Sequence, residues 1–352
     1  MRIRSLLAPE YHSPPNPRPP PYDGAEDTVT DVHFTAIRLA GKRLGLLSWA
    51  PNSQQAAAAK SSVDLIVLGD SYADDVDMGY RCWPSLLAAA RGGSCLSVAR
   101  GGSCSIDALE QYDRARAFMA RSHLSASEST VVIVHTGGND MLQALKFLGP
   151  LAVLLLWVDL ILLAAGLAGL RPRLTALPRW SFFGVLSRRI GASLVALLAL
   201  LARHGHTRVL VSSLPVCSAM PLSRVLLSSM TGAWMWRGGT RFITRLIDEA
   251  TVLLSGHLRA ALSDAAATHG LDLLYLEEGR VLVEVSKAHR EHNEATWFGD
   301  SMWRDMHHPR PWVHAEIAAA AGALLRADDA AATSVKAQPA PRRRLSPSRS
   351  RR

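Results

Sequence analysis

Three residues of this sequence have the side-chain types that activate a hydroxyl nucleophile. Ser71 follows Gly69-Asp70 directly after a run of apolar residues, and Asp305 precedes His308 by three positions near the other end of the chain. A serine hydroxyl is a weak nucleophile at neutral pH, so it needs a base within hydrogen-bond reach, and the base needs a partner that fixes its tautomer. We therefore predict that Ser71 attacks a carbonyl carbon, that His308 takes its proton and that Asp305 orients His308.

Such a reaction also needs donors for the negative charge that develops on the carbonyl oxygen. Removal of one such donor typically costs about 3 kcal/mol of transition-state stabilisation. Gly101-Gly102 follows the candidate strand 94–99, and Asn139 follows the β-branched run 130–135. We expect the backbone N–H groups of Ser71 and Gly102 and the amide of Asn139 to form this oxyanion hole. Asp70 and Asp140 are expected to cap or brace the loops.

Apolar strand-like runs alternate with helical stretches along the chain, which favours an α/β fold. The pattern predicts a three-layer αβα fold, in which helices cover both faces of a central, mostly parallel sheet of about five strands. Ligands in such folds bind beyond the carboxyl ends of the strands, where Ser71, Gly102 and Asn139 all lie. The predicted strands cover 63–68, 94–99, 130–135, 207–213 and 271–276, and the predicted helices cover 84–91, 105–122, 187–204, 240–268 and 312–326.

Ser71, Gly102, Asn139 and His308, in this order, resemble the four blocks of the SGNH (GDSL) hydrolase family. Their contexts read GDSY, GGSCSID, GGND and DMHHP, and the segments WPSLLA (83–88) and RVLVSSLP (208–215) are also similar to family segments. The resemblance covers roughly residues 63 to 325. It implies a flavodoxin-like fold and a serine esterase or lipase with the catalytic triad Ser71, Asp305 and His308, and it implies no cofactor and no metal.

Two positions within these blocks have alternatives. The family often has an Asn before the second-block Gly, whereas this chain reads Ser97-Val98-Ala99-Arg100, so either Gly101 or Gly102 could be the donor. His308 is preferred over His307 because it alone has the Asp-x-x-His spacing and a following proline.

The expected activity is cleavage of a carboxylic ester, from a small molecule or a lipid, through an acyl-enzyme on Ser71. Two alternatives remain open at this point. A catalytically inactive protein of the same fold would bind lipids or membranes without reacting, and an acyltransferase would use the same triad with an alcohol as acceptor.

Composition indicates one catalytic domain with two tails. The chain has 352 residues and 48% hydrophobic content, enough for a full core. We expect a Pro-rich, largely disordered extension over 1–60, a hydrolase domain over 61–328 and a disordered basic tail over 329–352. Residues 29–49 have mixed apolar character and are compatible with one further strand or helix.

The basic tail accounts for most of the formal charge. The net charge is +9, and seven basic residues without an acid from Ala330 onward leave +2 for the rest. Nucleic acid is therefore not expected as a partner, except weakly through the tail.

Cysteine usage favours a reducing compartment. Cys82, Cys95, Cys104 and Cys217 lack C-x-x-C or metal-ligand spacing, and no secretory signal is visible. Free thiols and an intracellular or membrane-associated location are expected. A Cys95–Cys104 bridge stays open if the protein is exported by another route.

A hydrophobic insertion is expected at about 147–185. Asp159 is the only ionisable residue in the run 147–170, which as a helix would extend about 36 Å. A single membrane crossing would separate Asn139 from His308. Three interpretations remain, in order of preference: a buried or partly exposed helix beside the site, a lipid-facing lid or interfacial helix, and a re-entrant or hairpin anchor. The second would bring this run into contact with a membrane surface.

Overall fold

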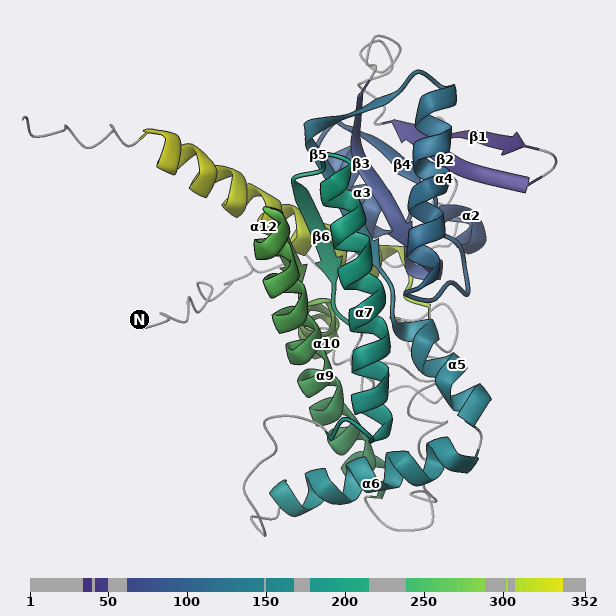
Figure 1. The fold of residues 1–352 in the computed structure, drawn as a ribbon, viewed down its shortest axis with the longest axis vertical. Coiled ribbons are helices and arrows are strands. Elements are labelled where there is room, and N and C mark those ends of the chain that lie inside the picture. The colour runs from purple at the N-terminus through teal and green to yellow at the C-terminus, as the bar shows by residue number, and fades with distance from the viewer. Residues whose placement is uncertain are drawn as a thin grey trace, which may run out of the picture.

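A seven-stranded sheet forms the centre of the protein (Figure 1). The computed structural model describes residues 34–39, 42–49, 62–148, 150–167, 178–214, 239–288, 302 and 308–337. Five strands pair in parallel in the order β4-β3-β5-β6-β7, which confirms the predicted α/β fold. Their bounds are β3 (Ser62–Gly69), β4 (Ser94–Ser97), β5 (Ser125–His135), β6 (Arg208–Ser212) and β7 (Asp272–Leu276).

The strand order places a topological switch point at the carboxyl edge of the sheet. The chain passes from β3 to β4 on one side and then crosses to β5 on the other, so the carboxyl ends of β3 and β5 lie at the topological switch point. Ligands of doubly wound sheets bind at such points. Ser71 follows β3 and Asn139 follows β5, so both lie at this edge.

An antiparallel hairpin extends the sheet beyond β4. Its strands are β1 (Phe34–Leu39) and β2 (Lys42–Trp49), and β2 pairs with β4 so that Leu47 lies opposite Leu96. The prediction that residues 1–60 are largely disordered is therefore wrong for the residues of these two strands. The physical reason is that the edge of β4 needs hydrogen-bond partners for its backbone, and β2 provides them. The remaining residues before 62 lie outside the described part of the chain.

Helices cover both faces of the sheet because its apolar side chains alternate between the two. Ile66 and Leu68 of β3 join the core under α4 (Asp107–Arg121), α7 (Phe182–Arg203) and α9 (Gly239–His269). Leu65 and Val67 join the core under α3 (Trp83–Ala90), α10 (Glu278–Ala288) and α12 (Pro311–Ala337).

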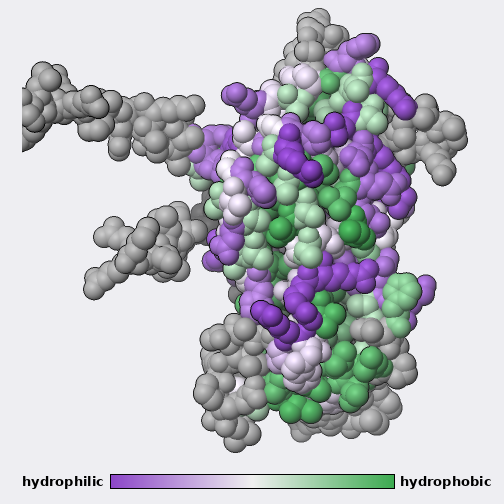
Figure 2. Space-filling view, in the orientation of Figure 1, coloured by the Kyte–Doolittle hydropathy of each residue, from purple (hydrophilic) through white to green (hydrophobic). Residues whose placement is uncertain are grey.

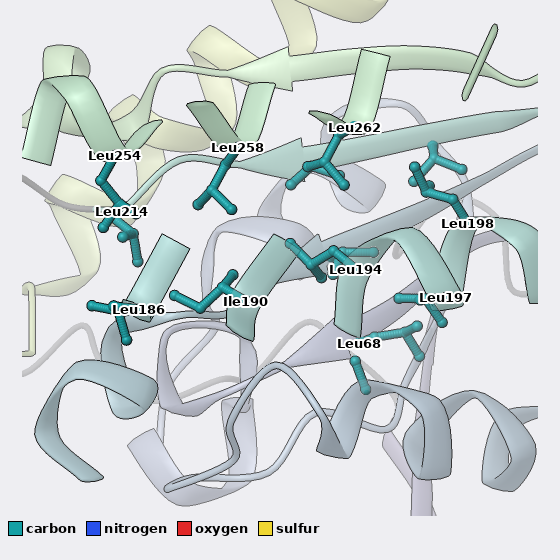
Figure 3. Packing of buried hydrophobic residues seen from close by; sticks show 14 of the residues in the cluster. Leu68, Leu186, Ile190, Leu194, Leu197, Leu198, Leu214, Leu254, Leu258 and Leu262 are labelled. Atoms are coloured by element: carbon teal, nitrogen blue, oxygen red, sulfur yellow. The ribbon is translucent and has the colours of Figure 1, made fainter. Parts of the chain in front are cut away.

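The α7–α9 contact is a ladder of leucines (Figure 3). Leu186, Ile190 and Leu194 recur every four residues on α7 and face Leu254 and Leu258 of α9. Among the described helices, α7 alone is long and apolar enough to cross a membrane by length and composition. Half of the relevant α7 window is buried inside the protein, and the helix leads directly into β6, so here it is a core helix.

The hydrophobic insertion folds as the end of α5 (Gly138–Leu148) followed by α6 (Pro150–Leu167). Pro150 begins α6, a position that suits its fixed φ and missing N–H. α6 crosses the lower ends of α7 and α9 in Figure 1. Asp159 is fully buried, and its Oδ2 accepts a hydrogen bond 3.0 Å long from the N–H of Phe183 at the start of α7. α6 is therefore a partly exposed helix that packs against α7 and α9, and its contact with a membrane surface stays a prediction.

The C-terminal boundary also differs from the expectation. The basic tail was expected to be disordered from residue 329, yet α12 continues to Ala337. Alanine has the highest helix propensity, and Ala330, Ala331 and Ala332 extend the helix. Arg208 holds this part of α12 to the sheet through ion pairs with Asp328 and Asp329.

Candidate active site

The turn that carries Ser71 is defined by close contact between β3 and β5. A Cβ atom on Gly69 would lie 2.4 Å from the carbonyl oxygen of His135, so only glycine fits there. The N–H of Asp70 donates to that same oxygen over 3.1 Å, and the Asp70 carboxylate accepts from the N–H of Tyr72. Ser71 then opens the short 3-10 helix η2 (Ser71–Ala73). The Gly-Asp-Ser sequence thus places the hydroxyl just beyond the sheet edge.

The imidazole of His308 meets this hydroxyl. Its Nε2 lies 2.9 Å from Oγ of Ser71, although the two residues are 237 positions apart. Ser71 is 8% exposed and His308 is half-buried, so the pair borders solvent without being surrounded by it. When Ser71 donates to Nε2, the neutral imidazole carries its proton on Nδ1. An acceptor such as a carboxylate would stabilise that tautomer.

Backbone contacts hold the segment that contains His308. The hydroxyl of Tyr80 donates to the carbonyl of Pro309, and the N–H of Arg310 donates to the carbonyl of Met302 over 2.9 Å. The ring of Tyr72 lies 6.2 Å from that of His308. Asp305, the predicted partner of His308, and His307 lie outside the described residues, so the role of Asp305 stays a prediction.

The hydrogen bonds in the loop that follows β4 favour Gly102 over Gly101 as the oxyanion donor. The N–H of Gly101 donates to Oδ2 of Asp74 over 3.3 Å, which occupies it. Gly102 has φ +78°, is exposed, and its N–H has no hydrogen-bond partner within the described residues. The N–H of Ser71 is likewise without a partner there.

Asn139 connects two of the predicted loops. Its Nδ2 donates to the carbonyl of Ser103 over 3.0 Å, which joins the start of α5 to the loop that follows β4. This bond uses one of the two amide hydrogens, so the other remains for a ligand. Asp140 accepts two hydrogen bonds of 2.7 Å from Ser105, one from its N–H and one from its hydroxyl. Asp140 thus braces the loop, and burial raises the pKa of its carboxyl.

Gln111 is a structural link that sequence reasoning missed. Its Oε1 accepts from the N–H of Gly69 over 2.6 Å, and its Nε2 donates to the carbonyl of Gly69 and to Oγ of Ser103. One side chain on α4 therefore fixes both the strand end before Ser71 and the loop after Gly102. The only available signal was a polar residue on the otherwise apolar face formed by Ala108, Tyr112 and Ala115.

A buried ionic chain lies behind the nucleophile, and it too was missed. Nδ1 of His135 lies 3.0 Å from Oδ1 of Asp70, and its Nε2 lies 2.7 Å from Oε2 of Glu278. Both ring nitrogens face carboxylates, so both act as donors and the ring is an imidazolium. Burial alone would lower the pKa of His135, but the charges of Glu278 and Asp70 and their hydrogen bonds outweigh it and hold the pKa well above 6.5.

The buried ionic chain of Asp70, His135 and Glu278 is surrounded by further side chains. Ser212 donates to Oε2 of Glu278, and the ring of Tyr72 stacks on that of His135 at 5.2 Å. Tyr72 therefore separates the charged His135 from the imidazole of His308. His314, also beside Tyr72, is neutral, because burial and then the charge of His135 lower its pKa to about 3.

The three described cysteines, Cys82, Cys95 and Cys104, are buried thiols outside any disulfide, so the Cys95–Cys104 bridge is not formed. In the described ranges no group of three or more His, Cys, Asp or Glu side chains could hold a metal ion. The groups described at this edge of the sheet are the Ser71 hydroxyl, the His308 imidazole and several N–H donors.

No family model matches the sequence, and no curated protein matches it. Among solved structures, the chain is similar to an extracellular lipase from Streptomyces rimosus at 15% sequence identity and a TM-score of 0.39. That likeness covers 75% of this chain and 99% of the lipase.

Proposed function

We propose that this protein is a serine hydrolase of the SGNH type that cleaves carboxylic esters through an acyl-enzyme on Ser71. The observation that carries the proposal is the 2.9 Å contact between Oγ of Ser71 and Nε2 of His308. This distance lies within the range for a nucleophile and its general base. The two residues were paired from their types and spacing, and they meet at the switch point of the sheet.

The first half of the reaction forms the acyl-enzyme. His308 Nε2 takes the proton of the Ser71 hydroxyl while Oγ attacks the ester carbonyl carbon, and the carbonyl oxygen becomes an oxyanion. The N–H groups of Ser71 and Gly102 and the Asn139 amide donate to that oxygen. The tetrahedral intermediate then collapses, the C–O bond to the alcohol breaks, and the imidazolium protonates the leaving oxygen.

The second half releases the acid. Water enters, His308 takes one of its protons, and the hydroxide attacks the acyl carbon to form a second oxyanion. Collapse of this intermediate returns the proton to Ser71 and frees the carboxylic acid. Asp305 is assigned to His308 Nδ1, where a carboxylate stabilises the imidazolium in both halves. An acyltransferase would differ only in using an alcohol in place of water.

Ester hydrolysis by purified variants tests this assignment. Short and long p-nitrophenyl acyl esters are given to wild type, Ser71→Ala and the matched control Ser122→Ala, which removes a hydroxyl at the far end of α4. We expect Ser71→Ala to lose about 10⁴-fold or more in kcat and Ser122→Ala to keep it. Equal turnover by wild type and Ser71→Ala would reject the mechanism. Adding a competing alcohol measures the share of acyl transfer.

A further inference from the structure

The charge of this chain is concentrated in one stretch that brackets α6. Between residues 141 and 247 the sequence has one acidic residue, Asp159, and twelve basic residues. The formal charge of this stretch is therefore +11, more than that of the whole chain. Its basic residues are Lys146, Arg171, Arg173, Arg179, Arg188, Arg189, Arg203, Arg208, Arg224, Arg237, Arg241 and Arg245.

The single acid of that stretch is not available at the surface. Asp159 is fully buried and accepts the N–H of Phe183 at the positive N-terminal end of α7. Burial raises the pKa of its carboxyl, and the hydrogen bond to Phe183 opposes that rise. The described surface contributed by α6 therefore contains no charged group.

The outer face of α6 is apolar and exposed. Leu151, Leu154 and Ile161 leave 50%, 62% and 61% of their surface uncovered, while Leu156 and Leu160 on the inner face are buried. Figure 2 shows hydrophobic residues gathered at this lower end of the molecule, beneath a band of hydrophilic ones. A monomeric soluble protein rarely exposes a contiguous surface of this kind without a partner.

Two exposed aromatic side chains and several exposed cations lie on the segments that adjoin α6. Phe147, at the end of α5, is 76% exposed, and Trp180, just before α7, is 60% exposed. Their sequence neighbours Lys146 and Arg179 are exposed, as are Arg241 and Arg245 in the first turns of α9, which packs against α6. Amphipathic aromatics beside cations are typical of segments that lie in the headgroup region of a bilayer.

We infer that α6 is an interfacial helix and that this end of the protein docks on membranes that contain anionic lipids. The apolar face of α6 enters the boundary between headgroups and acyl chains, and the surrounding cations contact lipid phosphates and carboxylates. Charge complementarity selects the partner, because α6 presents no surface acid and the exposed cations Lys146, Arg179, Arg241 and Arg245 outnumber the acids Asp248 and Glu249, which lie one turn beyond Arg245 on α9. Buried Asp159 fixes α6 to α7, which keeps the helix lying across the end of the molecule.

The orientation of the docked protein determines which substrates the candidate active site can reach. α5 leads from Asn139 at the carboxyl edge of the sheet down to α6 (Figure 1). The bilayer would therefore lie on the side to which that edge opens, and an ester within a membrane lipid becomes the expected substrate class. This substrate step rests on the proposed hydrolase, whereas the docking itself does not.

Flotation of the full-length protein with vesicles tests the inference. Vesicles of phosphatidylcholine alone are compared with vesicles that contain phosphatidylserine at about one lipid in three. We expect binding only to the anionic vesicles, and we expect it to weaken as salt is raised. The double variant Leu154→Glu/Ile161→Glu should lose most of that binding. The control Val76→Glu, which adds one acid at a side chain 52% exposed on α2 (Asp75–Met78), should bind more tightly than the double variant by at least tenfold.

Variants that remove basic side chains test whether the cations beside α6 contribute to binding. A basic residue near an anionic surface contributes about fivefold in affinity, so Arg241→Gln/Arg245→Gln should bind about 25-fold more weakly. Arg116→Gln/Arg121→Gln on α4 removes the same charge elsewhere and should lose less. Ser71→Ala should bind like wild type while failing to hydrolyse esters, which separates docking from catalysis.

Three outcomes would overturn the docking. Equal binding by the α6 variant and Val76→Glu would assign the affinity to the basic tail. Equal binding to neutral and anionic vesicles would remove the role of the cations. A stable dimer in light scattering that Leu154→Glu/Ile161→Glu dissociates would assign the face to a second copy of the chain.

Discussion

Replacing Glu278 should reveal how strongly the buried ionic chain supports the nucleophile turn. Glu278 is fully buried, and its Oε2 accepts hydrogen bonds from His135 Nε2 and from Ser212. Glu278→Leu would leave the His135 imidazolium with Asp70 as its one carboxylate. Removing one partner of a buried ion pair costs about 3–5 kcal/mol, because the remaining charge stays buried without compensation. Glu278→Gln keeps an acceptor and loses only the charge, so we expect a smaller loss of about 1–2 kcal/mol.

Urea unfolding at neutral pH measures both variants, with Glu277→Gln as a matched control. Glu277 is the adjacent residue, but it is exposed and pairs with exposed Arg259. Its replacement should change stability by less than about 0.5 kcal/mol. The His135 ring should also titrate at a lower pH in Glu278→Gln than in wild type, which NMR of the imidazole nitrogens can follow. If Glu278→Leu costs no more than Glu277→Gln, the buried charge does not stabilise the fold as described.

Four further outcomes follow from the same contacts. Gln111→Leu would leave the N–H and the carbonyl of Gly69 without their side-chain partner. Thermal unfolding should show a loss of about 2–4 kcal/mol in stability, together with a lower kcat. Gly69→Ala would push a methyl group to 2.4 Å from the His135 carbonyl, so soluble yield should fall sharply while the exposed Gly92→Ala is tolerated better. Asp159→Ala should leave the buried N–H of Phe183 without its acceptor and cost about 1 kcal/mol or more in urea unfolding, whereas Asp159→Asn should cost less. The raised pKa of His135 means that the folded state binds this proton more tightly than the unfolded state. The resulting stabilisation is complete below about pH 6.5 and is lost as pH rises through the folded pKa, which a pH series of urea midpoints can check.

The parallel sheet and its covering helices were predictable because their patterns are local. Apolar runs such as residues 63–68 and 130–135 mark strands, and each lies within the strand that the structure shows. The hairpin of β1 and β2 was not assigned, because its stability comes from pairing with β4 and not from a strong pattern of its own.

The site was predictable where a residue type itself suggests chemistry. Ser71 and His308 are such residues, and their contact was expected from their types, from the Asp-x-x-His spacing and from the resemblance to the SGNH blocks, while their catalytic roles stay a prediction. The choice between Gly101 and Gly102 needed coordinates, because only the hydrogen bond to Asp74 shows that the N–H of Gly101 is occupied.

The buried ionic chain left almost no trace in the sequence. His135 ends an apolar strand, and Glu278 lies 143 positions later in a segment that also contains the exposed Glu277. Nothing in the sequence distinguishes the glutamate that is buried from its solvated neighbour. The sequence also could not show which face of α6 is buried, because the helix is almost uniformly apolar around its circumference and packing alone decides which face is covered.

Covalent labelling by a fluorophosphonate most directly tests the account that Ser71 is a nucleophile activated by His308. Trypsin releases residues 61–81 as one peptide, since Lys60 and Arg81 flank it. Mass spectrometry should find the phosphonyl adduct on Ser71 within that peptide in wild type, little of it in His308→Ala, and none in Ser71→Ala. An unmodified peptide in folded wild-type protein, or equal labelling in wild type and His308→Ala, would contradict the account.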